Sequence, residues 1–431
     1  MRAWLARQAY SLLLRLGTPA YLWRVWSRGR EEPDYRAHWP ERLGFYSTPA
    51  QHRAWVWVHA VSLGEARAAA PLVAALRTQR PGLRLLLTHT TATGREAGRA
   101  LLQAGDLQAW LPYDTPGAVR RFLRHFQPRV GVLMETEVWP NLLNEASKAG
   151  VPMVLANARL SPKSLRQGQR FAALLQPAAR VLTLSLAQTQ EDAERLRAMG
   201  ASPVVVCGNV KFDMTPAPEL LALGQRWRAA DARPLCLAAS TREGEEAGLI
   251  AAWQGALASG LWHGEAPRLL IVPRHPQRFD EVAALLQQQG LRVSRRSAWP
   301  QGRPDADALA ADVWLGDSMG EMPAYYAGAS IAWLGGSFAP LGGQNLIEAA
   351  ACGCPLVMGP STYNFAEAAE LSLSAGAARR AADWPEAVRM ALQWLAQGTD
   401  RGQSAALAFA RQHQGASFRM SKCIGKISRS P

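Results

Sequence analysis

The stretch from Trp314 to Pro360 constrains the fold of this chain more than any other. Three short apolar runs in and beside it predict buried strands, at 312–316, 330–334 and 355–358. A glycine-rich loop, 335–343, and a predicted helix, 345–351, lie between the last two. Open α/β sheets bind ligands at the carboxyl ends of their strands, where helix N-termini and glycines suit phosphate. The stretch therefore predicts a nucleotide or sugar-phosphate site, with plain βα turns as the alternative.

The same strand–helix alternation runs through most of the chain. Further predicted strands lie at 55–59, 83–89, 129–134, 152–156, 181–185, 204–206, 235–239 and 269–272. A stiff, proline-rich joint at Met214–Pro218 separates two series of strands. We therefore expect domains at 36–213 and 219–415. A basic tail, 416–431, follows them and lacks an apolar helical pattern.

Composition excludes some classes of protein. The chain of 431 residues is 48% hydrophobic and 19% charged, so it is not disordered. Its net charge of +14 implies an anionic partner. Nucleic acid is the weaker choice, because no RNA-binding aromatic signature or zinc finger is present. Five cysteines without a C-x-x-C pair fit a reducing compartment and disfavour disulfides or a metal site.

Residues 1–30 are basic, apolar and aromatic, and contain no acid. Six arginines lie among them, Arg2, Arg7, Arg15, Arg24, Arg28 and Arg30. Arginines spread through the apolar runs disfavour a membrane span, and no signal-peptide cleavage site is evident. We expect a membrane-anchor helix lying in the plane of an anionic surface. A tilted span with snorkelling arginines, or a soluble helix packed on the body, are the alternatives.

Candidate site residues follow the predicted strands of the first domain. Glu65 begins a helix after strand 55–59, where it suits a general base at the mouth of a cleft. Simple complementarity to the helix dipole is the alternative, which spacing alone favours. Glu135 follows strand 129–134 and Lys211 follows strand 204–206. A solvated loop acid and an exposed lysine are the alternatives for these two residues.

In the second domain, Arg274 follows strand 269–272 beside prolines. This position suits a phosphate clamp, with an ordinary surface arginine as the alternative. Neither domain carries G-x-G-x-x-G after its first strand, which disfavours NAD or FAD. Two doubly wound halves of this kind match the GT-B frame of sugar-nucleotide transferases.

Seven motifs occur in a specific order along the chain. They are His59-Ala-Val-Ser-Leu-Gly-Glu65, Met134-Glu-Thr-Glu-Val-Trp-Pro-Asn141, Ala156-Asn-Ala-Arg-Leu-Ser161, Gly208-Asn-Val-Lys-Phe-Asp213, Val272-Pro-Arg-His-Pro276, Gly316-Asp-Ser-Met-Gly-Glu321 and the stretch 335–348. Together they resemble the 3-deoxy-D-manno-octulosonic acid (Kdo) transferase family over residues 1–415.

The resemblance implies an α/β GT-B fold, with two Rossmann-like domains facing a cleft and an N-terminal membrane-anchor helix. It implies an inverting glycosyltransferase on the cytoplasmic face of the inner membrane. The enzyme would transfer Kdo from CMP-Kdo to a lipid A precursor, tetraacyldisaccharide bisphosphate, in lipopolysaccharide biosynthesis. Neither a metal nor another cofactor is expected, and the absence of an Asp-x-Asp pair fits this.

The resemblance also assigns roles to residues. Glu65 matches the catalytic base, and Glu135 and Lys211 match the residues that assist the transition state. The 36–213 domain would bind the acceptor. The 219–415 domain would bind the CMP-sugar, through Pro273, Arg274, Met319, Gly320, Glu321, Asn345, Leu346, Ile347 and Glu348.

One departure concerns Asn345-Leu-Ile-Glu348, where the family often has Asn-Pro-Leu-Glu. The Asn and Glu remain, so we expect nucleotide contacts with a changed turn. Two other functions compete with Kdo transfer. One is a soluble sugar-nucleotide epimerase on a GT-B frame, which the basic N-terminus disfavours. The other is a non-catalytic lipid-binding relative, which predicts loss of the carboxylate at Glu65.

Overall fold

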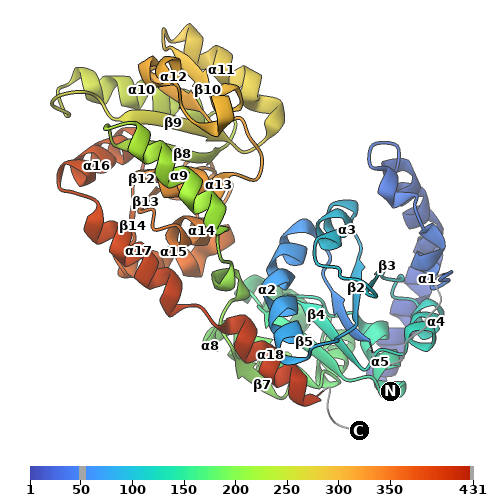
Figure 1. The fold of residues 1–431 in the computed structure, drawn as a ribbon. Helices are drawn as coiled ribbons and strands as arrows, with labels where there is room; N and C mark the ends of the chain where they lie inside the picture. Colours follow the sequence, from blue (N-terminus) through green and yellow to red (C-terminus); the bar gives the residue numbers. More distant parts are fainter. Residues whose placement is uncertain (48–54, 428–431) are drawn as a thin grey trace. The chain divides into compact units, whose positions relative to one another are not determined.

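Figure 1 shows the computed structural model, which describes residues 1–47 and 55–427. The chain forms two compact units. Unit 1 comprises Met1–Asp213 and Gln414–Pro431, and unit 2 comprises Met214–His413. The predicted joint at Met214–Pro218 thus begins directly after the first segment of unit 1, which ends at Asp213.

Within the described residues, unit 1 holds a seven-stranded sheet in which every neighbouring pair is parallel. The strand order is β3-β2-β1-β4-β5-β6-β7. The strands are β1 (Val56–His59), β2 (Leu85–His89), β3 (Leu107–Trp110), β4 (Val130–Met134), β5 (Met153–Ala158), β6 (Leu184–Ala187) and β7 (Val204–Val206). The central strands are fully buried, as a parallel sheet covered by helices requires.

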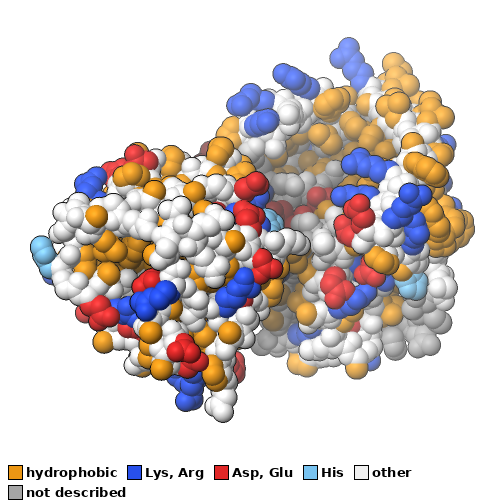
Figure 2. All heavy atoms as spheres, turned by 90° about the horizontal axis from the view of Figure 1, so that it is seen from above, with side chains coloured by type: hydrophobic (Ala, Val, Ile, Leu, Met, Phe, Trp, Pro, Cys, Tyr) orange, Lys and Arg blue, Asp and Glu red, His pale blue; other side chains and the backbone are white. Residues whose placement is uncertain are grey.

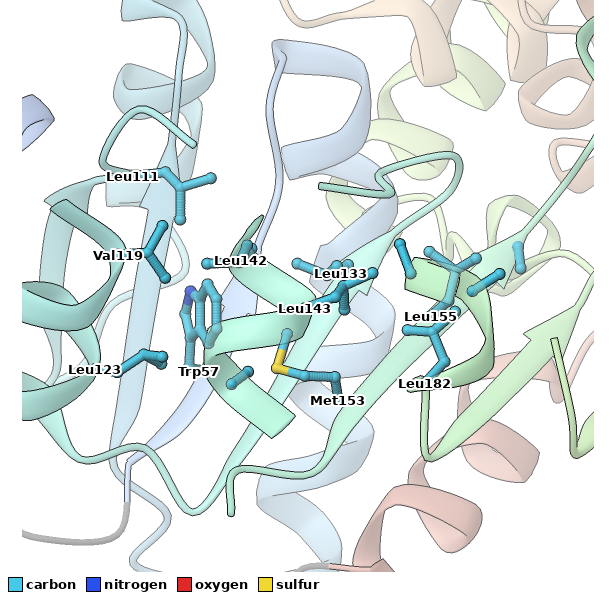
Figure 3. Packing of buried hydrophobic residues seen from close by; sticks show 14 of the residues in the cluster. Trp57, Leu111, Val119, Leu123, Leu133, Leu142, Leu143, Met153, Leu155 and Leu182 are labelled. Carbon is cyan, nitrogen blue, oxygen red and sulfur yellow. The ribbon is translucent and has the colours of Figure 1, made fainter. Parts of the chain in front are cut away.

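Helices connect and cover these strands. They are α1 (Arg2–Arg28), α2 (Leu63–Gln79), α3 (Ala92–Arg99), α4 (Pro116–Phe126), α5 (Pro140–Lys148), α6 (Pro162–Arg170), α7 (Ala172–Arg180), α8 (Gln190–Ala198) and α18 (Ala416–Ile427). Figure 3 shows the packing on one face of the sheet, where Trp57 of β1 lies beside Val119 and Leu123 of α4 and Leu142 of α5. Apolar burial of this kind stabilises the layer that carries the strand ends.

Unit 2 repeats the design. Its described residues contain a second seven-stranded parallel sheet, in the order β10-β11-β9-β8-β12-β13-β14. The strands are β8 (Leu235–Thr241), β9 (Arg268–Pro273), β10 (Val293–Arg295), β11 (Val313–Leu315), β12 (Ile331–Leu334), β13 (Leu356–Met358) and β14 (Ala378–Arg380). The helices are α9 (Pro218–Ala230), α10 (Glu245–Ala258), α11 (Phe279–Gln288), α12 (Ala306–Ala310), α13 (Met322–Gly328), α14 (Leu346–Ala351), α15 (Ala366–Ser374), α16 (Trp384–Ala396) and α17 (Asp400–Gln412).

The prediction of two parallel α/β series is therefore confirmed. Three strands were not predicted, namely β3, β10 and β14. Each lies at an edge of its sheet. Edge strands here are short and partly exposed, so they lack the continuous apolar run that reveals a buried strand.

The C-terminal segment corrects a second expectation. Residues 416–431 were expected to lack a helical pattern, but α18 occupies 416–427 and packs on α2 of unit 1. Met420, Ser421 and Ile424 are buried at helical spacing. Asp213 accepts hydrogen bonds from the backbone N–H groups of Gly415 and Ser417, at 2.5 Å each, where the chain re-enters unit 1. The helical pattern of α18 is hard to recognise in the sequence because Ser421, a polar residue, occupies one of its buried positions.

The N-terminal helix α1 docks on unit 1 through polar contacts. The Tyr10 hydroxyl donates to Asp114 Oδ2 at 3.0 Å, and the Ser11 hydroxyl donates to Asn141 Oδ1 at 3.1 Å. Large apolar side chains remain exposed along the helix, namely Trp4, Leu5, Leu12, Leu13, Leu16, Tyr21, Trp23 and Trp26. Figure 2 shows hydrophobic and basic (Lys or Arg) side chains together at the right of the view, the side on which Figure 1 places α1. Across residues 1–47 and 55–427, no helix is long and apolar enough to cross a bilayer.

Candidate active site

The first site lies where the strand order of sheet 1 reverses, between β1 and β4. From β1 the chain moves outward to β2 and β3, then returns to β4 on the other side of β1. The connections leave on opposite sides at this point, which opens a crevice at the carboxyl ends of the two strands. Glu65 follows β1 and Glu135 follows β4. The topology thus brings together two carboxylates 70 residues apart in the sequence.

Glu65 lies in the first turn of α2. Ser62 caps this helix, and its hydroxyl accepts a hydrogen bond from the Glu65 N–H. In return, the Val61 N–H donates to Glu65 Oε2 at 2.9 Å, and the Ser62 hydroxyl donates to Oε1 at 3.3 Å. This reciprocal cap fixes the carboxylate at the strand end.

Burial, helped by the nearby carboxylates of Glu137 and Glu135, raises the pKa of Glu65 to about 7, although the hydrogen bond from Val61 opposes the shift. A carboxylate with a pKa near neutrality is well matched to accept a proton in catalysis. Glu65 therefore caps its helix and has a pKa suited to a base, while its role as the general base stays a prediction.

Glu135 is buried and carries a backbone φ of 58°, in the left-handed region that few residues other than glycine adopt. Two cations face its carboxylate. Lys211 Nζ lies 3.4 Å from Oε1, and Arg159 Nε lies 3.4 Å from Oε2. The structure thus brings the predicted residues Glu135 and Lys211 together, with a positive charge on each side of the carboxylate.

Asn157 supports this cluster, a role that the sequence analysis missed. It is fully buried at the end of β5 with a φ of 51°. Its Oδ1 accepts a hydrogen bond from the Val210 N–H at 3.1 Å. That contact fixes the 3-10 helix η3 (Val210–Asp213), which carries Lys211. The Asn-Ala-Arg motif was visible in the sequence, but the partner 53 residues away was not.

The second site lies at the reversal of sheet 2, between β8 and β12. Ser240, near the end of β8, has a φ of 57°. A Cβ on Gly335, just after β12, would lie 2.2 Å from the Ser240 carbonyl oxygen. Glycine is therefore required at position 335, because the two strand ends approach this closely.

The glycine-rich loop corrects part of the phosphate prediction. Glu245, a buried residue at the start of α10, accepts hydrogen bonds from three loop N–H groups, those of Gly336, Phe338 and Ala339. The distances are 2.8 to 3.1 Å. These donors are committed to a carboxylate of the protein, so they do not form a phosphate cradle. The sequence showed the glycines but not the acid that organises them.

Positive charge gathers instead at the ends of β8 and β9. Pro273 ends β9 and is buried, and the Arg274 N–H donates to the Thr241 carbonyl at 3.0 Å. Burial, followed by the charges of Arg242, Arg274 and Arg278, lowers the pKa of His275. Arg278 is held by Glu246. Arg274 and Arg242 therefore offer guanidinium groups for an anion at these strand ends.

The other predicted nucleotide-binding residues also follow strands of sheet 2. After β11, Met319 is 64% exposed, Gly320 has a φ of 80°, and Glu321 pairs with Arg296 at 2.8 Å. In the last motif, Asn345 caps α14 by accepting from the Ile347 N–H at 3.2 Å, while Leu346 and Ile347 are buried. A ligand at α14 would therefore meet the backbone or the side chains of Asn345 and Glu348. No cluster of His, Cys, Asp or Glu in the described part of the chain is arranged to hold a metal ion.

Comparison with known proteins identifies close relatives of this chain. Residues 37–214 match the family model for 3-deoxy-D-manno-octulosonic-acid transferase. The 3-deoxy-D-manno-octulosonic acid transferase of Bordetella pertussis is 50% identical over 96% of this chain and 98% of its own. The enzyme of the same name from Haemophilus influenzae is 35% identical over 83% of each chain.

Solved structures share the fold at low sequence identity. The structure of HepE from Anabaena in complex with UDP has a TM-score of 0.56, with 16% identity over 86% of this chain and 100% of its own. UDP-GlcNAc 2-epimerase from Neisseria meningitidis has a TM-score of 0.54, with 15% identity over 86% of this chain and 98% of its own. At this identity the likeness shows the fold alone, which resembles GT-B glycosyltransferases.

Proposed function

The chain belongs to the 3-deoxy-D-manno-octulosonic acid (Kdo) transferase family and is a glycosyltransferase, and on this premise we propose that it transfers Kdo from CMP-Kdo to a lipid A precursor with Glu65 as general base. The observation that carries the proposal is the reversal point of sheet 1. There a carboxylate with a pKa of about 7 lies beside a second carboxylate, Glu135, which is paired with Lys211 and Arg159.

Inverting transfer needs one base. Glu65 accepts the proton of the acceptor hydroxyl as that oxygen attacks the anomeric carbon of Kdo, and the bond to the CMP phosphate breaks. The electron pair of that bond leaves with CMP. No covalent intermediate forms on the protein.

Charge develops on the departing CMP phosphate and must be stabilised. We assign this role to Arg274 in unit 2, where Arg242 adds positive charge. Met319, Gly320 and Glu321, with Asn345 to Glu348, complete the proposed CMP site. In unit 1, Lys211 and Glu135 assist the transition state. The pairing of their side chains supports this assignment, since it fixes both groups.

We propose that α1 anchors the protein to the cytoplasmic face of the inner membrane, where its lipid acceptor resides. Exposed leucines and tryptophans line the helix, and its arginines suit an anionic leaflet. A helix in the membrane plane needs no apolar span, so the proposal agrees with the hydropathy of α1.

A transfer assay tests the function. Purified full-length protein in detergent receives CMP-Kdo and tetraacyldisaccharide bisphosphate with EDTA present, and mass spectrometry follows the lipid. Wild type should yield Kdo-bearing lipid. Glu65→Gln should bind CMP-Kdo normally but lose turnover by a factor on the order of 100 or more, because the base is lost. A CMP-Kdo-binding protein that modifies no lipid would contradict the proposal and favour the non-catalytic relative. Interconversion of sugar nucleotides would favour the epimerase.

A further inference from the structure

A buried cluster of charges with an excess of positive charge lies beneath α1. Arg42, Arg95 and Glu41 are 1%, 8% and 4% exposed, and two guanidinium groups face one carboxylate. Arg95 Nη1 lies 4.0 Å from Glu41 Oε2, which also accepts a hydrogen bond from the Trp110 N–H. Outside the cluster, His38 is mostly exposed beside Glu41, and Asp34 pairs with Arg99 and also acts on the charge of Arg95. Buried charges are normally paired, but Arg42 forms no ion pair within the described part of the chain, whereas Arg95 faces Glu41.

Arg42 carries the imbalance. Its guanidinium lies 4.0 Å from the centre of the Trp110 ring, and Nη1 donates one long hydrogen bond, 3.5 Å, to the Thr90 carbonyl. Nε and Nη2 of Arg42, together with Nη1 of Arg95, form no hydrogen bond among the described residues, although the Tyr113 hydroxyl lies near Arg42 and Glu41 lies near Arg95. An unsatisfied buried guanidinium nitrogen costs free energy. The protein retains three such atoms in one place, as a site for an anion would.

An aromatic groove opens above this cluster. Leu22, Trp23 and Trp26 of α1 line one side, Trp39 of the 3-10 helix η2 (Trp39–Leu43) lines the other, and Arg42 forms part of the floor. Trp23 is 72% exposed, although tryptophan is among the more buried residues of folded proteins. The volume of about 330 Å³ is at the lower end of the range for ligand pockets, roughly 300 to 1,000 Å³. The groove therefore has room for part of a lipid rather than a whole one.

The groove and Glu65 lie on the same edge of sheet 1. Arg42 contacts Thr90, which follows β2. The next residue, Thr91, donates from its hydroxyl to the Val61 carbonyl at 2.8 Å, and the Val61 N–H binds Glu65. A lipid seated in the groove would therefore extend along the strand ends toward the base.

We propose that this groove binds one phosphate and the adjoining acyl chain of the lipid acceptor, with the phosphate paired to Arg42 and the chain lying against Trp23, Trp26 and Trp39. The proposal rests on the proposed function, since it assigns the acceptor to this groove. The phosphate supplies the counter-charge that Arg42 lacks, and the acyl chain covers the exposed tryptophans. Because Arg42 is 1% exposed, binding requires the rim side chains to move and admit the phosphate to the guanidinium.

Steady-state transfer by the full-length protein in detergent tests this site. The acceptors are tetraacyldisaccharide bisphosphate and the same lipid lacking one phosphate, prepared separately for each position. Removal of one of the two phosphates should raise the acceptor KM of wild type at least ~10-fold, because the charge-assisted hydrogen bond to that phosphate is lost. Arg42→Gln should raise the KM for the bisphosphate to the same extent and abolish this preference. The KM for CMP-Kdo should not change.

Three further variants guard against misfolding. Trp39→Ala removes an exposed wall of the groove without touching the buried cluster, and should also raise the acceptor KM. Arg379→Gln and Phe418→Ala are the matched controls. Arg379 is a half-buried arginine of unit 2 stacked on Trp394, and Phe418 is an exposed aromatic residue of α18. Both controls should leave the acceptor KM unchanged. Thermal midpoints report on folding of every variant.

Several results would overturn the site. One is an unchanged acceptor KM in folded Arg42→Gln and Trp39→Ala. Another is a rise in the KM for CMP-Kdo in step with that for the acceptor. Native mass spectrometry of acceptor binding without CMP-Kdo separates this site from the proposed function. An inactive wild type that still binds the acceptor through Arg42 would refute only the function. A phospholipid bound through Arg42 and not displaced by the acceptor would refute the choice of ligand.

Discussion

Glu65 owes its chemistry to neighbours that lie far from it in the sequence. Its hydrogen bonds to Val61 and Ser62 are local, but the carboxylates of Glu135 and Glu137 come from the end of β4. Removal from water and like charges both disfavour the ionised form, which explains a pKa near 7. A carboxylate in the first turn of a helix would otherwise ionise readily.

The raised pKa of Glu65 predicts the pH dependence of transfer. A protonated carboxyl cannot accept a proton, so kcat should rise as the pH passes through about 7 and level off above it. Glu137→Gln removes a like charge and should shift this rise to lower pH. An exposed control, Glu194→Gln on α8, should leave the profile in place. A wild-type profile flat from pH 5 to 8 would contradict the assignment of Glu65 as base.

Lys211 provides a second prediction at this scale. It pairs with the strained, buried Glu135, and removing a positioned charge from a transition state typically costs on the order of 100-fold in rate. Lys211→Ala should therefore lower kcat by about that factor, with little change in acceptor KM. Lys163→Ala, an exposed lysine of α6, is the control. If Lys211→Ala keeps the wild-type kcat, Lys211 does not assist the reaction.

At the scale of elements, α1 combines a docked face with an exposed apolar one. Tyr10 and Ser11 hold the helix to unit 1 through Asp114 and Asn141. The leucines and tryptophans that face outward cannot contribute to folding there. Exposed apolar side chains gathered along one element indicate an interaction surface.

The proposed membrane role of α1 makes a testable prediction. Leu13 and Leu16 are 69% and 71% exposed, so Leu13→Ser with Leu16→Ser should leave the thermal midpoint unchanged. Binding to anionic phospholipid vesicles should weaken on the order of 100-fold, since insertion buries each leucine. Sedimentation with vesicles measures this, with Leu261→Ser, an exposed leucine of unit 2, as control. Equal sedimentation of all three proteins would refute the membrane role of α1.

The central strands and the edge strand β7 were predictable, whereas the edge strands β3, β10 and β14 and the helix α18 were not. Strands such as β4 are buried on both faces and read as continuous apolar runs. The edge strand β14 reads Ala-Arg-Arg and is stabilised by pairing with β13. In α18, the buried Ser421 breaks the apolar row. Local patterns are weak wherever a partner element supplies the burial.

For the whole molecule, the return of the chain to unit 1 has a consequence for stability. Ile424 of α18 is buried in the core of unit 1. It lies more than 200 residues beyond Asp213, where the first segment of that unit ends. Truncating such a residue costs about 2 to 5 kcal/mol because a cavity remains. Unit 1 is therefore complete only after unit 2 has been synthesised.

Ile424→Ala should destabilise unit 1 alone. Hydrogen exchange can measure the free energy of unfolding separately for each unit during denaturation. It should fall by about 2 to 5 kcal/mol in unit 1 and stay unchanged in unit 2. Phe418→Ala, on the exposed face of the same helix, should have little effect. An equal loss in both units would show that they unfold as one.

The sequence by itself determined the two parallel α/β series, the family and the strand ends that carry Glu65, Glu135 and Arg274. These features are local, because strand burial, helix starts and glycine turns leave their marks within a few residues. Only the tertiary structure decided the rest. The pKa of Glu65, the Glu135–Lys211 pair, the capture of the glycine loop by Glu245 and the unbalanced charge at Arg42 all depend on groups from distant segments. No local pattern records such contacts, since they arise only when the sheet brings its strand ends together.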